Sequence, residues 1–185
     1  GVFLGTSNAG ILETELGYRQ RDPITGALPS GVNYEARHST YSVVSFMRRY
    51  FQLSSVSVVI STACSSSAKT FAAAARMISL GVIDAAIVGG VDSLCYTTLY
   101  GFGSLELTSS QACRPYDANR SGLSLGEGAA FALLQRPQSP KNKPASTHAA
   151  SIYPASTYLL GAGETSDAHH MSSPHPQGLG AKMAM

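Results

Sequence analysis

The chain has 185 residues, of which 44% are hydrophobic and only 13% are charged, and its formal net charge is +2 at pH 7. This composition excludes an intrinsically disordered chain, which would combine low hydrophobicity with high charge. With no basic block, it also predicts neither a nucleic-acid partner nor a membrane-surface role. No apolar run approaches the ~20 residues of a membrane span, and no secretory signal opens the sequence.

Three cysteines, Cys64, Cys95 and Cys113, are widely spaced along the chain. An odd number without an export signal argues against a disulfide framework, and no CxxC pair suggests a metal site. We therefore expect free thiols in a cytoplasmic protein. The question that remains is whether one of them is reactive.

The first half of the chain predicts strands alternating with helices. A short apolar run at 2–6 is typical of a buried strand, and the Pro- and Gly-containing residues 19–31 predict an exposed loop. Apolar residues at helical spacing predict a helix over 33–52. A strand at 56–60, a helix from 65 to 80 ending at Gly81, and a strand at 84–90 then form a βαβ unit, which predicts a parallel pair of strands.

The second half is richer in loops. The pattern predicts a Gly-rich loop at 101–127, a strand at 129–135, an exposed Pro/Ser/Lys-rich excursion at 136–157, a short strand at 158–163 and the opening of a helix at 180–185. The expected organisation is a first region at 1–135, the excursion at 136–157 and a second region at 158–185.

Cys64 occupies a special position between the strand ending at Ile60 and the helix beginning near Ser65. A thiol at a helix N-terminus lies at the positive end of the helix dipole, which favours the thiolate. The unpaired N–H groups there can also stabilise an oxyanion, and the carboxyl edge of an open α/β sheet is where ligands bind. The competing interpretation is a small buried hydrophobe, the common fate of a free cysteine. Neither Cys95 nor Cys113 lies at such a junction.

Four sequence blocks carry a resemblance to a known family. They are Ser61-Thr-Ala-Cys-Ser-Ser-Ser67, Gly89-Gly90, Arg114-Pro-Tyr-Asp-Ala-Asn-Arg-Ser-Gly122 with Gly126-Glu-Gly128, and Ser166-Asp-Ala-His-His-Met-Ser-Ser-Pro174. In this order they resemble the condensing enzymes, the β-ketoacyl-[acyl-carrier-protein] synthases of fatty acid and polyketide assembly.

The resemblance implies a thiolase-like fold of five layers, α/β/α/β/α, present here as a truncated N-terminal half with the start of the second half. It implies that Cys64 accepts an acyl group from an acyl carrier protein. Decarboxylation of malonyl-carrier then yields the carbanion that attacks the acyl-enzyme.

The same resemblance assigns further residues and partners. Phe102 matches the phenylalanine that lines and gates the acyl pocket, although it also suits an ordinary core position. Ser172 and Ser173 match positions near the phosphopantetheine channel, and His170 matches a histidine of the active-site wall. No cofactor is implied beyond the phosphopantetheine of the carrier, and a homodimer or a heterodimer with a related synthase subunit is expected. We expect no metal, because the Pro-containing loop that carries the histidines at 169, 170 and 175 lacks ligands at helical spacing.

The family also uses two histidines, in a His-Gly-Thr and a Gly-His block, that do not occur in these residues. On this basis the sequence is expected to be an internal piece of a longer enzyme, inactive in condensation by itself. Ser54-Ser55 also departs from the Gly-Pro common in the family.

Two alternatives remain. A non-catalytic partner subunit, like the chain-length factors of polyketide systems, would characteristically lack the cysteine. A thiolase would lack the Arg-Pro-Tyr-Asp block. Residues 100–107 favour a specialised bacterial pathway such as aryl polyene assembly.

Overall fold

The computed structural model describes residues 1–136, 157–171 and 173–185. The chain divides into two compact units, Gly1–Arg136 and Pro137–Met185.

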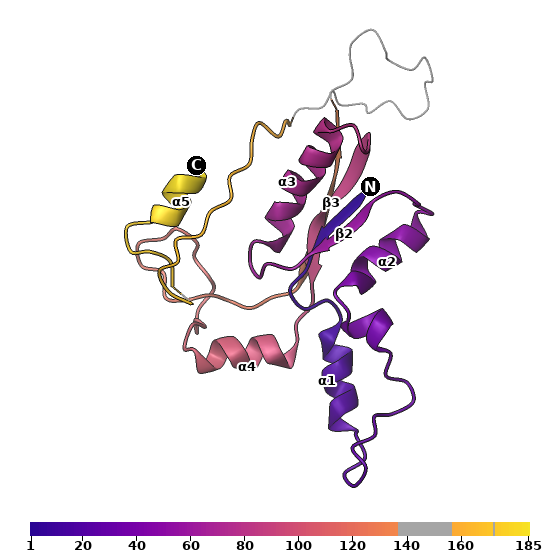
Figure 1. The fold of residues 1–185 in the computed structure, drawn as a ribbon. Coiled ribbons are helices and arrows are strands. Elements are labelled where there is room, and N and C mark those ends of the chain that lie inside the picture. Colours follow the sequence, from indigo (N-terminus) through magenta and orange to yellow (C-terminus); the bar gives the residue numbers. More distant parts are fainter. Residues whose placement is uncertain (137–156, 172) are drawn as a thin grey trace. The chain divides into compact units, whose positions relative to one another are not determined.

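The first unit is built on a four-stranded mixed sheet in the order β2-β1-β3-β4 (Figure 1). Its strands are β1 (Val2–Gly5), β2 (Ser57–Ile60), β3 (Ala85–Asp92) and β4 (Gly128–Gln135). The four strands predicted in this region are confirmed. Strands β2 and β3 both run parallel to β1, whereas β4 runs antiparallel to β3. The parallel orientation predicted for β2 and β3 is confirmed, but the two strands are not neighbours, because the fully buried strand β1 lies between them.

Two helices cover opposite faces of the sheet, and the alternation of side chains along β1 decides what each helix packs against. Phe3 belongs to the apolar cluster under α3 (Ser66–Ser79), together with Ala74, Ile78 and Val88. Val2 and Leu4 point to the other face and pack with Val44 of α2 (Tyr41–Tyr50). The resulting α/β/α layers hold the end of β1 and the start of α3 together.

Helix α3 begins and ends where the sequence predicts. Its Ala-rich interior favours the helix, and the following Gly81 adopts a φ of +74°. A left-handed residue after the last turn ends a helix, and glycine adopts this conformation at little cost. This helix is the scaffold of the candidate site.

The single helix predicted over 33–52 is two helices. A π-helical turn η1 (Tyr34–His38) and α2 are separated at Ser39, whose ψ of 128° is extended. The two segments have different partners, because η1 packs against α1 (Ile11–Arg19) and α2 packs against β1 and β2. One straight helix could not make both sets of contacts.

Helix α1 and helix α4 (Tyr96–Ser104) were not predicted, and α4 replaces the start of the loop expected at 101–127. The carboxylate of Glu15 in α1 accepts hydrogen bonds from the N–H groups of Tyr96 and Thr97, each at 2.8 Å. It also accepts one from the Thr97 hydroxyl at 2.5 Å. Glycines at 101 and 103 suggested a loop, but this cap from another helix stabilises the first turn of α4.

The second unit holds α5 (Leu179–Ala184), which confirms the helix predicted near the end of the sequence. The strand predicted at 158–163 is wrong: the segment has no strand pairing among the described residues, and its apolar side chains Tyr158, Leu159 and Leu160 are exposed. Most of the predicted excursion at 136–157 lies outside the described residues.

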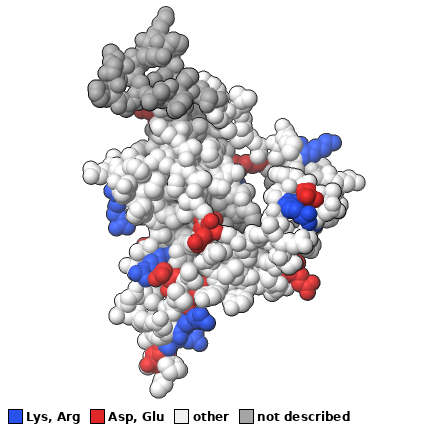
Figure 2. Space-filling view, turned by 180° about the vertical axis from the view of Figure 1, so that it is seen from behind, with Lys and Arg blue, Asp and Glu red and all other residues white. Residues whose placement is uncertain are grey.

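Charged side chains are sparse and mixed in sign on the face seen in Figure 2, without a block of one sign. Within the described part of the chain, no helix is both long and apolar enough to cross a membrane.

Candidate active site

Cys64 lies in the tight turn that joins β2 to α3. The strand ends at Ile60 and the helix begins at Ser66, so five residues reverse the direction of the chain. Ala63, immediately before the cysteine, has a φ of +52°. A non-glycine residue in this left-handed region is uncommon and costs of order 1–3 kcal/mol. The turn that presents Cys64 is therefore a conformation that its surroundings must enforce.

Two serines of this turn enforce it through their hydroxyl groups. Ser66 Oγ accepts a hydrogen bond from the Thr62 N–H at 2.8 Å and donates one to the Ala63 carbonyl at 2.6 Å. Ser65 Oγ donates to the Thr62 carbonyl at 2.9 Å. Short polar side chains satisfy backbone groups at a helix start in this way. The run of serines after Cys64 thus holds the turn closed on both sides of the thiol.

The first turn of α3 approaches the sheet closely because the sheet has glycine there. A Cβ on Gly5 would lie 2.6 Å from the Ser66 carbonyl oxygen, and one on Gly90 would lie 2.7 Å from Ser67 Cβ. One turn further, buried Thr70 accepts a hydrogen bond from the Gly89 N–H at 3.1 Å. These contacts fix the height of α3, and hence of Cys64, above the sheet.

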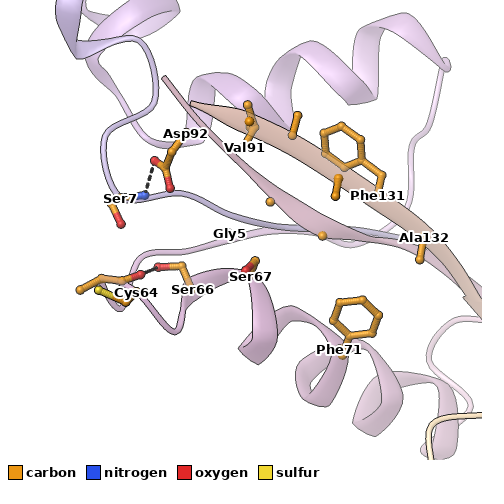
Figure 3. A pocket seen from close by; sticks show the side chains of 16 residues that line it. Gly5, Ser7, Cys64, Ser66, Ser67, Phe71, Val91, Asp92, Phe131 and Ala132 are labelled. Carbon is orange, nitrogen blue, oxygen red and sulfur yellow. Dashed lines mark hydrogen bonds between the residues drawn. The ribbon is translucent and has the colours of Figure 1, made fainter. Parts of the chain in front are cut away.

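Cys64 lines an open cavity of about 650 Å³ between α3 and the strands β3 and β4. In Figure 3, Cys64 lies at one end, while the rings of Phe71 and Phe131 face the cavity from α3 and β4. Most of the other lining residues are small: Gly5, Ala63, Ser66, Ser67, Gly89, Gly90, Gly128, Ala129, Ala130 and Ala132. Glycine, alanine and serine leave room for a substrate beside an exposed thiol.

Two polar residues at the edge of this cavity were not predicted as site residues from the sequence. Ser7, just after β1, and Asp92, the last residue of β3, both line it with Cys64. The Asp92 carboxylate accepts a hydrogen bond from the Ser7 N–H at 2.8 Å (Figure 3). Their position in the sequence was the available signal, because both lie at the carboxyl ends of buried parallel strands, and these ends meet at one edge of the sheet.

The other two cysteines have different surroundings. Cys95 is 1% exposed, and its Sγ lies 3.1 Å from the Thr98 hydroxyl oxygen. Cys113 is exposed in the loop before β4. The expectation that Cys95 lies away from such a junction is wrong, because Cys95 is the N-cap residue of α4, three residues after β3 ends. Its burial distinguishes it from Cys64, and neither Cys95 nor Cys113 lines the cavity that Cys64 lines.

The remaining predicted site residues are Phe102, His170, Ser172 and Ser173. Phe102 is half-buried in α4 and is not among the described residues that line the cavity. His170 and Ser173 are exposed and belong to the second unit. Ser172 lies outside the described residues.

Asp167 organises the loop that contains the histidines. Its Oδ2 accepts a hydrogen bond from the His175 N–H at 2.9 Å, and its Oδ1 accepts one from the His169 N–H at 3.1 Å. These two bonds, first that from His175, hold the pKa of the Asp167 carboxyl below its usual value. In the described ranges no group of three or more His, Cys, Asp or Glu side chains could hold a metal ion.

The family model described as "Beta-ketoacyl synthase, N-terminal domain" matches residues 1–139 of the 185. The chain therefore belongs to the β-ketoacyl synthase family, a family of condensing enzymes. This confirms the family that the sequence blocks predicted, and the first three blocks lie within the matched residues, whereas Ser166–Pro174 lies beyond them.

Similarity to curated proteins agrees with membership of this family. The chain is 36% identical over 132 residues to 3-oxoacyl-[acyl-carrier-protein] synthase 2 of Rhizobium meliloti (strain 1021), covering 67% of this chain and 30% of that protein. It is 33% identical over 135 residues to the protein of the same name from Vibrio cholerae, covering 69% of this chain and 31% of that one. The matched region spans less than a third of the length of these relatives.

Solved ketosynthases share the fold. A ketosynthase in complex with its chain length factor, from Xenorhabdus doucetiae, matches at a TM-score of 0.75 and 34% identity, over 99% of this chain and 43% of that one. A β-ketoacyl synthase from Burkholderia phymatum matches at 0.79 and 24% identity, over 100% and 45% of the two chains. These similarities confirm the predicted thiolase-like α/β class.

Proposed function

We propose that this chain carries the nucleophile of a 3-oxoacyl-[acyl-carrier-protein] synthase and that Cys64 is that nucleophile. The proposal rests chiefly on one observation: Cys64 is an exposed thiol at the start of α3 and opens onto a cavity at the edge of the sheet. Membership of a family of condensing enzymes supplies the reaction class.

The proposed reaction has two stages. The Cys64 thiolate attacks the carbonyl carbon of an acyl thioester, a new C–S bond forms, and the thiol of the carrier arm leaves as a thiolate that takes up a proton. Malonyl-carrier then loses CO₂, and the carbanion so formed attacks the acyl-cysteine. A C–C bond forms, the C–S bond to Cys64 breaks, and a β-ketoacyl thioester leaves on the second carrier.

Residues of the first unit suit the first stage. Attack on a thioester places negative charge on its carbonyl oxygen, which N–H donors stabilise. The first N–H groups of a helix lack intrahelical partners, and Cys64 precedes the first residue of α3 by two positions. The N–H groups of Ser65 and Ser66 already donate to the Thr62 and Ala63 carbonyls, at 3.4 and 3.1 Å, so the oxyanion donors must come from other N–H groups around the thiol. The small side chains around it leave space for the acyl group.

The partners proposed are an acyl carrier protein, which delivers both substrates on its phosphopantetheine arm, and a second synthase subunit. The subunit can be a copy of the same protein or a related chain. The relative from Xenorhabdus doucetiae, solved with a chain length factor, supports a related chain.

Acyl transfer to Cys64 is the direct test. The 185-residue chain is incubated with an acyl-carrier thioester, and intact-mass spectrometry measures the added acyl mass, located by peptide mapping. Wild type and C113A should gain one acyl group at Cys64, whereas C64A should gain none.

Acylation that persists in C64A would overturn the assignment. A folded wild-type chain that takes up no acyl group would instead favour the alternative of a non-catalytic partner subunit.

A further inference from the structure

Three hydrogen bonds from one loop converge on a single oxygen of Asp92. Its Oδ1 accepts from the Thr6 hydroxyl at 2.9 Å, from the Ser7 N–H at 2.8 Å and from the Asn8 N–H at 3.0 Å. Bonds to an ionised acceptor are about twice as strong as neutral ones. The loop that follows β1 is therefore tied to a residue more than 80 positions away in the sequence.

The register of the sheet explains why Asp92 reaches this loop. Gly5 pairs with Gly90, so two residues further along the parallel strands Ser7 comes level with Asp92. Side chains two residues apart on a strand share a face, and Gly90 faces Ser67 of α3. Asp92 therefore lies on the face of the sheet that carries Cys64, as Figure 3 shows.

A second set of bonds holds the far end of the loop. Thr6 Oγ1 also accepts a hydrogen bond from the Ala9 N–H, and Ser93 Oγ donates to the Ala9 carbonyl, both at 2.9 Å. Ala9 is 6% exposed and has a φ of +47°. A strained backbone of this kind persists only where several contacts enforce it, so the loop is held in one conformation.

We propose that Asp92 is a positioning residue of the Cys64 site, which fixes the loop 6–9 as one wall of the cavity. This inference rests on the proposed function, because the wall bounds the space in which the acyl group would meet the thiol. Ser7 is the loop residue that lines the cavity, and Asp92 acts through it. The carboxylate itself takes no part in bond making.

Two matched pairs of variants test the proposal. D92A removes the acceptor, whereas D92N keeps one oxygen that can accept the same donors. T6V removes the buried hydroxyl with little change in volume, whereas T6S keeps it. Because Thr6 does not line the cavity, an effect shared by D92A and T6V must act through the loop.

Hydrogen exchange measures the loop directly and needs no activity. In wild type, D92N and T6S, the amides of Ser7 and Asn8 should exchange slowly, because they donate to residue 92. In D92A they should exchange at the rate of an open loop, and in T6V their protection should fall. Unchanged protection in D92A would overturn the proposal, whatever the acylation results.

The rate of acyl transfer to Cys64 measures what the loss of this loop conformation does to the site. We expect D92A and T6V to lower the rate of Cys64 acylation at saturating thioester by roughly tenfold to hundredfold, the effect of a misplaced reacting group. The KM should change little, and D92N and T6S should retain most of the rate. A D92A chain that loses loop protection but acylates at the wild-type rate would show that the wall has no positioning role.

Two further measurements separate the remaining outcomes. Loss of the cooperative unfolding transition in chemical denaturation together with lost acylation in D92A and T6V would mean general unfolding and would overturn the proposal. If the folded wild type takes up no acyl group, the proposed function fails by itself. The positioning role is then judged by iodoacetamide, whose rate at Cys64 relative to Cys113 should differ between D92A and D92N, and equal ratios would overturn it.

Discussion

Gly5 of β1 lies directly under Ser66, the first residue of α3, and no side chain fits between them. A Cβ on Gly5 would come 2.6 Å from the Ser66 carbonyl oxygen, which belongs to rigid backbone. Gly5→Ala should therefore lift the start of α3 and destabilise the fold by about 1–3 kcal/mol, as overpacking does. Chemical denaturation measures this loss, and Cys64 acylation should slow in the same variant.

Gly126→Ala is the matched control, since nothing lies within 4 Å of a Cβ built there and its φ is not in the left-handed region. Equal stability of the two variants would contradict the close contact between Gly5 and α3.

Cys64 should be the first of the three thiols to react with limiting iodoacetamide. It is exposed and lies at a helix start, Cys113 is exposed in a loop, and Cys95 is 1% exposed. We expect the order Cys64, Cys113, Cys95, read by peptide mass spectrometry on folded protein. Faster labelling of Cys113 would show that the junction does not activate Cys64, and equal labelling of all three would indicate an unfolded sample.

Phe102→Ala should alter the preference for acyl chain length more than it alters stability. The side chain is only half-buried in α4, so the loss should be smaller than the ~3–5 kcal/mol of a fully buried phenylalanine. Rates of Cys64 acylation with short and long acyl carriers, set against the denaturation midpoint, measure both effects. Leu99→Ala on the same helix is the control. A lower midpoint with an unchanged preference would make Phe102 an ordinary packing residue.

Glu15 should make the stability of the protein depend on acidic pH. Partial burial tends to raise the pKa of its carboxyl, but the hydrogen bonds from the Thr97 hydroxyl and from the N–H groups of Thr97 and Tyr96 outweigh it and lower the pKa below 4.5. A carboxyl with a lowered folded-state pKa contributes stability above its unfolded pKa, which is lost as pH falls through the folded value.

The free energy of unfolding of the wild type should therefore exceed that of the Glu15→Gln variant at neutral pH. The difference between the two should shrink as pH falls below about 4.5. Glu15→Ala should cost about 1 kcal/mol at pH 7, the usual cost of losing a helix cap. Glu35→Gln, at an exposed position in η1, is the control. A constant difference between wild type and Glu15→Gln down to pH 3 would contradict the role of the carboxylate charge.

The 185-residue chain should form no β-ketoacyl product from acyl-carrier and malonyl-carrier. None of its five histidines is followed by Gly-Thr or preceded by Gly, so the two histidine blocks that the family resemblance assigns to decarboxylation are not in these residues. Acylation of Cys64 without condensation is the expected result, measured by mass spectrometry of the carrier. Product at rates typical of enzymes, with a median near ~10 s⁻¹, would show that other residues decarboxylate the malonyl group.

Local sequence patterns predicted much of the first unit. The β-branched run before Cys64 and the Ala-rich run after it have strong and opposite preferences, so β2 and α3 form where the pattern predicts. The position of Cys64 at their junction follows from these two elements alone. The Ser61–Ser67 block and its companions further along the chain also sufficed to identify the family.

Contacts between distant residues decided the rest. Helix α4 forms over two glycines because Glu15, 81 residues before Tyr96, caps its first turn. The position of β1 between β2 and β3 could not be predicted from local sequence either, because strand order depends on which buried faces meet. The sequence places Asp92 at the end of a strand and shows no partner for it. The register of β1 and β3 places it beside the loop 6–9, where it accepts the hydrogen bond from Ser7.

The sequence by itself thus determined the family, the strands of the sheet and the junction that carries Cys64, because each is encoded in consecutive residues. Only the tertiary structure decided what surrounds the thiol. The glycines under α3, the wall tied to Asp92 and the cap on α4 join residues that are distant in the chain, and their hydrogen bonds and close contacts exist only once the sheet has assembled.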